Sequence, residues 1–252
     1  MNQSFRTVFV LWLRQIKRHF RSKPRVVGSL VQPILFLVAL GFGMGPVFRA
    51  AGQGNYIDFL APGIIGMAII FSAMFSGIEV IWDRQFGFLK ETLAAPVSRF
   101  DLMLGRTMGS ATVATFQGVF VFLVSLVVGF RPADWRLVLP AVAVMFLVAL
   151  LFAALGTSIA SRLSDMQGFQ LIMNFLIMPL FFLSGAMFPL DEVPAALALV
   201  ARFDPLTYGV DAFRGLFIGS SHFGVGTDIL VISVVVLVFL GVGSYSFSRM
   251  EA

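Results

Sequence analysis

The stretch LVLPAVAVMFLVALLFAALGTSIA, Leu137–Ala160, contains no charged residue and no interruption of its apolar character. The hydrocarbon core of a bilayer is roughly 30 Å thick, and a helix crosses it with about 20 apolar residues. Apolar and polar residues do not alternate here, as they would in a strand of a membrane barrel. The stretch therefore predicts a transmembrane helix.

Working outward, five further stretches meet the same requirement. They are Val26–Phe48, Ala61–Trp82, Met108–Phe130, Phe169–Phe188 and Ile229–Phe247. Of the 252 residues, 58% are hydrophobic and 12% are charged, against roughly 25% charged in a soluble domain. This composition excludes a water-soluble enzyme, and the absence of cysteine excludes disulfides and thiolate metal sites. We expect residues 1–252 to form a single all-α integral membrane domain with six spans.

The lysines and arginines predict the topology, because loops on the cytoplasmic side carry an excess of them. Most of the 18 fall on one predicted side: Arg6, Arg14, Lys17, Arg18, Arg21, Lys23, Arg25, Arg84, Lys90, Arg99, Arg106, Arg162 and Arg249. The other side has Arg49, Arg131, Arg136, Arg202 and Arg214. Both termini are therefore expected in the cytoplasm. The net charge of +5 points to anionic lipid rather than to nucleic acid.

Residues 1–25 predict an amphipathic helix at the membrane interface. One helical face gathers aromatic and apolar side chains, namely Phe5, Phe9, Trp12, Ile16 and Phe20. The opposite side carries cations, namely Arg6, Arg14, Lys17 and Arg18. Such a helix places its rings among lipid headgroups and its cations toward phosphates. It is either a topology anchor or a mobile elbow that touches a cytoplasmic partner.

Two segments between spans are patterned. In the cytoplasmic loop 83–106, Phe86, Leu89 and Leu93 lie at helical spacing before Pro96, which predicts a short amphipathic helix. That helix either packs on its own bundle or forms a docking surface.

The external segment 189–228 contains two helix starts, at Pro194 and at Asp204–Pro205. Each helix is expected to run about 11–13 residues, too short to cross a bilayer. The pair therefore lies on the outer surface or re-enters the membrane against the bundle.

The chain has few groups for chemistry of its own. None of its lysines (Lys17, Lys23 and Lys90) follows a glycine, so it has no phosphate-binding P-loop. Its two histidines lie far apart on opposite predicted sides, which disfavours a metal site. Buried charge near the midplane, expected of an ion-coupled carrier, is scarce. We therefore expect no catalytic residue and no bound cofactor, with driving energy from elsewhere.

A weak substrate path is predicted inside the spans. The polar side chains of Gln117 and Asn174 either line that path or form hydrogen bonds between helices. Met178, Phe181 and Phe182 would give the path an apolar wall, or they contact lipid.

Three motifs in order carry a resemblance to a known family. They are DRQFGFLKETLAAP (Asp83–Pro96), LSGAMFPLDEVP (Leu183–Pro194) and DPLTYGVDAFRG (Asp204–Gly215). On a six-span chain, this order resembles the permease subunits of ABC-2 type ABC transporters, particularly the branch of daunorubicin-resistance and nodulation-factor permeases. The chain departs from the family at Asp204, where asparagine is frequent, and at Phe88, where a small polar residue is frequent.

The resemblance implies partners and site residues. A separate ABC ATPase, in two copies that bind ATP and Mg, would power the complex, and a second permease copy or paralogue would complete the pore. Residues implied in ATPase coupling are Asp83, Arg84, Gly87, Lys90, Glu91 and Pro96. Residues implied in an external gate are Ser184, Gly185, Pro189, Pro205, Asp211 and Arg214. Asp211 and Arg214, three residues apart, are expected to pair across one helical turn or to remain a weak surface pair.

The implied function is export of a drug, lipid or lipid-linked glycan across the cytoplasmic membrane. A secondary transporter would instead follow an ion gradient without an ATPase. A lipid-handling enzyme would need His, Asp or Glu gathered at one membrane depth, and a structural protein would need no path.

Overall fold

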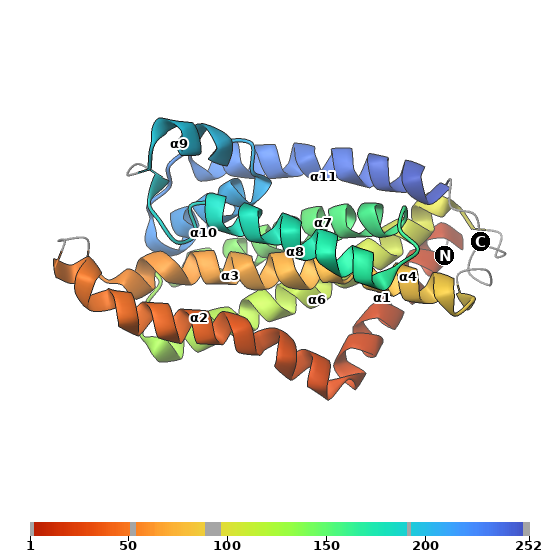
Figure 1. The fold of residues 1–252 in the computed structure, drawn as a ribbon, viewed down its shortest axis with the longest axis horizontal. Coiled ribbons are helices and arrows are strands. Elements are labelled where there is room, and N and C mark those ends of the chain that lie inside the picture. The colour runs from red at the N-terminus through yellow and green to blue at the C-terminus, as the bar shows by residue number, and fades with distance from the viewer. Residues whose placement is uncertain (1–2, 51–53, 89–96, 191–192, 249–252) are drawn as a thin grey trace.

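The computed structural model describes residues 3–50, 54–88, 97–190 and 193–248, in which every regular element is a helix (Figure 1). Within these ranges six helical stretches are long and apolar enough to cross a membrane. They run Val26–Phe48, Tyr56–Gln85, Arg99–Val128, Trp135–Ala160, Met166–Leu183 and Val225–Ser246. The prediction of an all-α membrane protein with six spans is confirmed.

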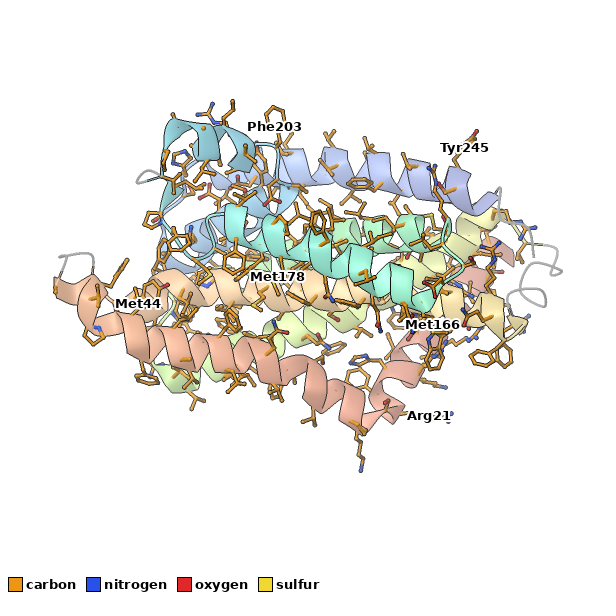
Figure 2. The ribbon with its side chains drawn as sticks, in the orientation of Figure 1. Arg21, Met44, Met166, Met178, Phe203 and Tyr245 are labelled. Atoms are coloured by element: carbon orange, nitrogen blue, oxygen red, sulfur yellow. The ribbon has the colours of Figure 1, made fainter. Side chains whose placement is uncertain are left out.

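The helices follow one another with short connections. They are α1 (Gln3–Arg21), α2 (Lys23–Ala50), α3 (Tyr56–Phe75), α4 (Ile78–Gln85), α6 (Arg99–Val128), the 3₁₀ turn η1 (Trp135–Leu137), α7 (Val138–Ala160), α8 (Met166–Leu183), α9 (Ala195–Ala201), α10 (Pro205–Ile218) and α11 (Val225–Ser248). The helices α1 and α2 meet in an elbow beyond Arg21 (Figures 1 and 2). The helices α3 and α4 together form the second span.

Helix α3 is the centre of the bundle. It packs against α2, α6, α7 and α10, and it is buried along most of its length. The outer helices instead present apolar side chains, as at Val127, which is 88% exposed, and Phe175, which is 84% exposed. Figure 2 shows Phe203 and Tyr245 pointing away from the bundle. Side chains of this kind on the outside of long helices require lipid around them, because water would disfavour so much apolar surface.

The bundle has two different ends (Figure 1). At one end, here called the terminal end, α1 begins, α4 ends and α11 ends. At the opposite end, here called the distal end, lie α9, α10 and the connection from α2 to α3. The predicted coupling and external segments therefore lie at opposite ends of the molecule.

Several predicted boundaries were wrong at the terminal end. Asp83 and Arg84 are in the last turn of α4, not in a loop, and residues 99–106 are the first turns of α6. The start of α6 is capped by Ser98, whose Oγ accepts a hydrogen bond from the Asp101 backbone nitrogen at 3.0 Å. A polar cap and cationic side chains let a helix continue beyond its apolar core. Hydropathy alone therefore placed this start too late.

The other boundary errors are smaller. Residues 23–25 belong to α2 rather than to the first helix, and α8 ends at Leu183 rather than at residue 188. The chain beyond Leu183 turns at Gly185, whose φ of +72° is left-handed and favours glycine.

The distal helix pair differs from its predicted form. Helix α9 has only 7 residues and is exposed apart from Ala201. Helix α10 has 14 residues and begins as predicted, with Pro205 as its first residue and Asp204 Oδ1 accepting a hydrogen bond from Leu206 N at 2.8 Å. Most of α10 is buried against α3, α7 and α11. It is therefore a full member of the bundle rather than a surface helix.

Candidate coupling site and translocation cavity

An ionic cluster at the terminal end joins three helices around Asp83. Its carboxylate lies 2.6 Å from Arg106 Nη2 of α6, 3.3 Å from Arg18 Nη1 and 3.5 Å from Arg14 Nη2, both of α1. One turn earlier on α4, Glu79 lies 3.8 Å from Arg18 Nε and accepts a hydrogen bond from Gln15. The last turn of α4 is thus tied to both α1 and α6.

The three arginines differ in burial, and so in what they contribute. The Arg106 and Asp83 side chains are only 6% and 5% exposed, whereas Arg14 is 42% and Arg18 is 28% exposed. Losing one member of a buried ion pair costs about 3–5 kcal/mol, because a charge remains buried without its partner. Exposed pairs contribute about 0.2–1 kcal/mol. The Asp83–Arg106 pair is therefore the strong link of the cluster.

Helix α1 is seated directly on α6. A Cβ atom added at Gly105 would lie 2.9 Å from the Val8 carbonyl oxygen, and one at Gly109 would meet the Gln15 side chain at 2.5 Å. The Trp12 Nε1–H donates a hydrogen bond to Thr112 Oγ1 at 2.9 Å. These small residues let the two helices approach closely, as in other G-x-x-x-G contacts within membranes.

This packing corrects the predicted orientation of the first helix. The rings of Phe5, Phe9 and Phe20 are indeed exposed, but Arg14 and Arg18 face the carboxylates of α4 instead of lipid phosphates. The contact buries an apolar and amide stripe that includes Leu11 and Gln15. The G-x-x-x-G spacing of Gly105 and Gly109 was the signal in the sequence that would have indicated it.

The remaining predicted coupling residues lie near this cluster or outside the described ranges. Arg84 is half-buried in α4. Gly87 lies just beyond α4 with φ +79° and no atom within 4 Å of its would-be Cβ. Of the two expected roles for this glycine, a bend and a close backbone approach, the structure shows the bend. Lys90, Glu91 and Pro96 lie outside the residues that the structure describes.

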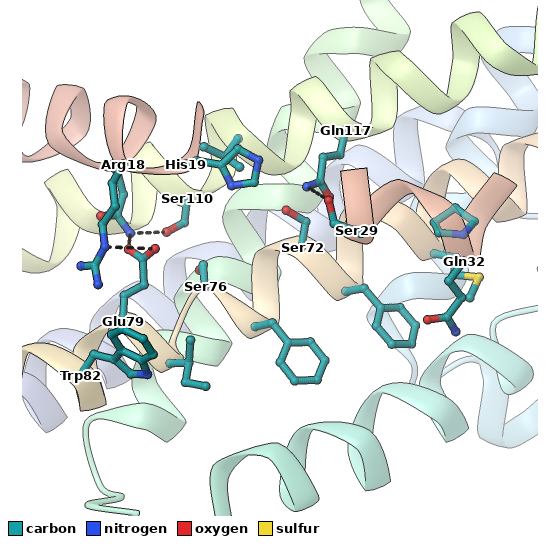
Figure 3. Close-up of a pocket in the computed structure, with 18 residues that line it drawn as sticks. Arg18, His19, Ser29, Gln32, Ser72, Ser76, Glu79, Trp82, Ser110 and Gln117 are labelled. Carbon is teal, nitrogen blue, oxygen red and sulfur yellow. Dashed lines mark hydrogen bonds and ion pairs between the residues drawn. The ribbon is translucent and has the colours of Figure 1, made fainter. Parts of the chain in front are cut away.

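Next to the cluster, a cavity of about 390 Å³ opens between α1, α2, α3, α4 and α6 (Figure 3). One end is formed by Arg18 and Glu79, and the other by Gln32 and Gln117 (Figure 3). Gln117 Nε2 donates a hydrogen bond to Ser29 Oγ at 2.7 Å. This residue therefore lines a cavity and also joins α6 to α2, which satisfies both predicted roles.

The other predicted path residues do not line this cavity. All four are on α8, where Phe181 is fully buried, Met178 is half-buried, and Asn174 and Phe182 lie on the exposed face. The cavity instead uses serines and glutamines that the sequence analysis did not single out, namely Gln15, Ser29, Gln32, Ser72, Ser76 and Ser110. Single polar residues in apolar spans gave no signal that they would converge.

The predicted external gate residues gather at the distal end. Arg214 of α10 donates from Nη2 to the carbonyl oxygens of Gly185 at 2.8 Å and Ala186 at 3.3 Å. Its guanidinium lies 3.8 Å from the centre of the Phe59 ring. Burial lowers the pKa of Arg214 to about 10, so it stays cationic at neutral pH. Ser184 donates to the Phe181 carbonyl oxygen at 2.8 Å, and Pro189 follows in the same turn.

The expected pairing of Asp211 with Arg214 was wrong. The Asp211 carboxylate accepts hydrogen bonds from the backbone nitrogens of His222 at 2.7 Å and Phe223 at 2.8 Å. Each of the two side chains thus binds backbone groups from a neighbouring segment, because burial makes unpaired backbone groups costly. Together they fix α10 to the turn after α8 and to the turn before α11.

The six apolar spans, the lipid-facing outer surface and the polar cavity inside the bundle define a multi-pass membrane protein of the transport class. The family model of the ABC-2 type transporter matches residues 6–218. The chain belongs to this family and is a transport permease.

Curated relatives agree with this assignment. The chain is 27% identical over 234 residues to Nodulation protein J of Rhizobium leguminosarum bv. viciae, covering 90% of each chain. It is 30% identical over 196 residues to Nodulation protein J of Rhizobium leguminosarum bv. trifolii, covering 77% of this chain and 74% of the relative. It is 27% identical over 217 residues to the putative transport permease ycf38 of Cyanophora paradoxa, covering 85% and 75%.

Proposed function

We propose that this chain is the membrane-spanning subunit of an ATP-driven exporter, powered by a separate ATPase. Two ATPase copies, each binding ATP and Mg, would act on two permeases, either two copies of this chain or this chain and a paralogue. The complex would lie in the cytoplasmic membrane with both termini in the cytoplasm. It would move a drug, a lipid or a lipid-linked glycan outward.

Membership of the ABC-2 family and the missing P-loop support a separate ATPase. None of the three lysines of the chain follows a glycine, so the backbone cradle and lysine that hold nucleotide phosphates are missing from this chain. A permease of this kind must obtain its driving energy through contact with a partner.

The observation that carries the proposal is a surface at the terminal end. Trp82 is 38%, Phe86 is 65% and Phe88 is 53% exposed, and they border a groove of about 160 Å³ beside Arg14 and Asp83. Exposed aromatic rings next to an arginine are typical of the centre of a protein interface. The ATPase is the proposed occupant, because this groove adjoins the predicted coupling stretch.

The Asp83 cluster explains how a movement there would reach the spans. A push on the bend at Gly87 acts on α4, and α4 cannot shift alone because Asp83 holds α1 and α6 through its arginines. ATP would drive transport by binding one arrangement of the complex more tightly than the other. At the distal end, the buried α10 would act as a re-entrant gate, positioned by Arg214 and Asp211.

Purification of the tagged chain from its native membrane tests this proposal. We expect an ABC ATPase to co-purify, and we expect proteoliposomes of the complex to transport substrate only with ATP and Mg. Transport by the chain alone, driven by an ion gradient, would contradict the proposal and favour a secondary transporter.

Single cysteines locate the contact and the sidedness, because the chain has no cysteine of its own. Phe88→Cys should cross-link to the ATPase, whereas Ser220→Cys at the distal end should not. An impermeant maleimide applied to whole cells should label Ser220→Cys and leave Ser164→Cys unlabelled. The reverse labelling would contradict the assigned topology.

A further inference from the structure

The cavity between α1, α2, α3, α4 and α6 presents hydrogen-bonding groups without partners. Gln32 and Ser72 are half-buried in its wall and point into it (Figure 3). Within the described ranges, neither the Gln32 amide nor the Ser72 hydroxyl forms a hydrogen bond with another residue. Unpaired polar groups inside a membrane span cost several kcal/mol. A ligand or water in the cavity must therefore supply their partners.

The charges in the cavity wall are already compensated. Glu79 lies 3.8 Å from Arg18 Nε and accepts a hydrogen bond from Gln15. Arg18 also lies 3.3 Å from Asp83. A phosphate would have to compete with two carboxylates for Arg18, and a cation would have to compete with Arg18 for Glu79. The third ionisable side chain in the wall, His19, is buried and carries its ring edge-on to Phe20.

Uncharged groups make up the rest of the wall. Its polar members include Ser29, Ser72, Ser110 and Gln117, and its apolar members include Met67, Phe71, Phe75, Ile78, Trp82 and Val113. The wall extends along α3 and α4 from Met67 to Trp82, a rise of about 22 Å at 1.5 Å per residue. Serine and glutamine side chains both donate and accept hydrogen bonds, so this wall suits hydroxyl and amide groups next to an apolar chain.

From these observations we infer that the cavity binds the uncharged, hydroxyl- or amide-rich head group of an amphiphile, with Gln32 and Ser72 as direct hydrogen-bonding residues. This inference deepens the proposed function, on which it rests, because the bound amphiphile is then the transported substrate. Drugs or lipids with a net charge on the head group fit this cavity poorly.

Protection from labelling tests the inference without ATP or a partner. Ser72→Cys in nanodiscs reacts with N-ethylmaleimide, and the probes are three dodecyl amphiphiles below their micellar concentration. They are dodecyl maltoside, dodecyl phosphate and dodecyltrimethylammonium. At about four times its Kd, dodecyl maltoside should slow the reaction about fivefold, and the charged probes should not. Ser164→Cys, on the terminal surface outside the cavity, serves as the control and should react at the same rate throughout.

A second variant separates hydrogen bonding from simple apolar binding. In the Ser72→Cys background, Gln32→Leu should weaken maltoside protection about three- to tenfold, the usual effect of one neutral hydrogen bond. Gln170→Leu, on the exposed face of α8, should have no effect.

Four results would overturn the inference: equal protection by all three probes, stronger protection by dodecyl phosphate, no protection at all, or a Ser72→Cys that does not react. None of them bears on whether an ATPase drives the chain, so the two proposals fail separately.

Discussion

Removing the Asp83 carboxylate is expected to destabilise the terminal end more than any other single charge change there. Asp83→Asn keeps the shape of the side chain but leaves Arg106 buried without a counter-ion, 2.6 Å from a neutral amide. Because both side chains are at most 6% exposed, the expected loss is about 3–5 kcal/mol of unfolding free energy. Arg106→Gln should cost a similar amount, since it strands the carboxylate.

The two arginines of α1 provide the internal comparison. Arg14→Gln removes a pair that is 3.5 Å long and 42% exposed on the arginine side, so the expected loss is below about 1 kcal/mol. Asp101→Asn, at the same end of α6 but outside the cluster, should also cost less than about 1 kcal/mol. Burial, rather than the number of charges, sets this order.

Unfolding by SDS titration in mixed micelles measures these differences, with tryptophan fluorescence as the readout. A double-mutant cycle of Asp83→Asn and Arg106→Gln isolates the pair itself. We expect a coupling energy above about 1 kcal/mol for this pair and below about 0.5 kcal/mol for Asp83 with Arg14. Equal losses for Arg14→Gln and Arg106→Gln, or additive effects of Asp83→Asn and Arg106→Gln, would refute the reasoning from burial.

Three further predictions concern other parts of the chain. Gly109→Leu should detach α1 from α6, because even a Cβ there meets the Gln15 side chain at 2.5 Å; faster proteolysis of the N-terminal segment would report it, and unchanged proteolysis would contradict the close packing. Gly87→Ala should uncouple ATP hydrolysis from transport, whereas Gly219→Ala should not, although both glycines have left-handed φ and open space around them; equal loss in both variants would indicate strain alone. Burial raises the pKa of Asp204 from 3.8 to about 7, so the folded state holds this proton more tightly; the stabilisation is complete below about pH 4 and is lost as pH rises toward 7. Asp204→Asn should flatten that part of the stability–pH curve, and an unchanged curve would exclude Asp204 as its source.

The sequence by itself determined the membrane class, the six spans and the capped start of α10. Each of these depends on residues close together in the chain. A run of about 20 apolar residues has one stable environment, the bilayer core, and an aspartate before a proline starts a helix wherever the helix later packs. The amphipathic pattern before Arg21 likewise predicted α1 as a helix.

Only the tertiary structure decided which faces of these helices meet. Arg14 and Arg18 could turn to lipid phosphates or to carboxylates, and the choice depends on Gly105 and Gly109, about ninety residues away in the chain. The cavity likewise needs Gln32, Ser72 and their neighbours from five helices in one register. In lipid, hydropathy does not distinguish one apolar helix face from another, so close packing and polar pairing between distant segments set rotation and register.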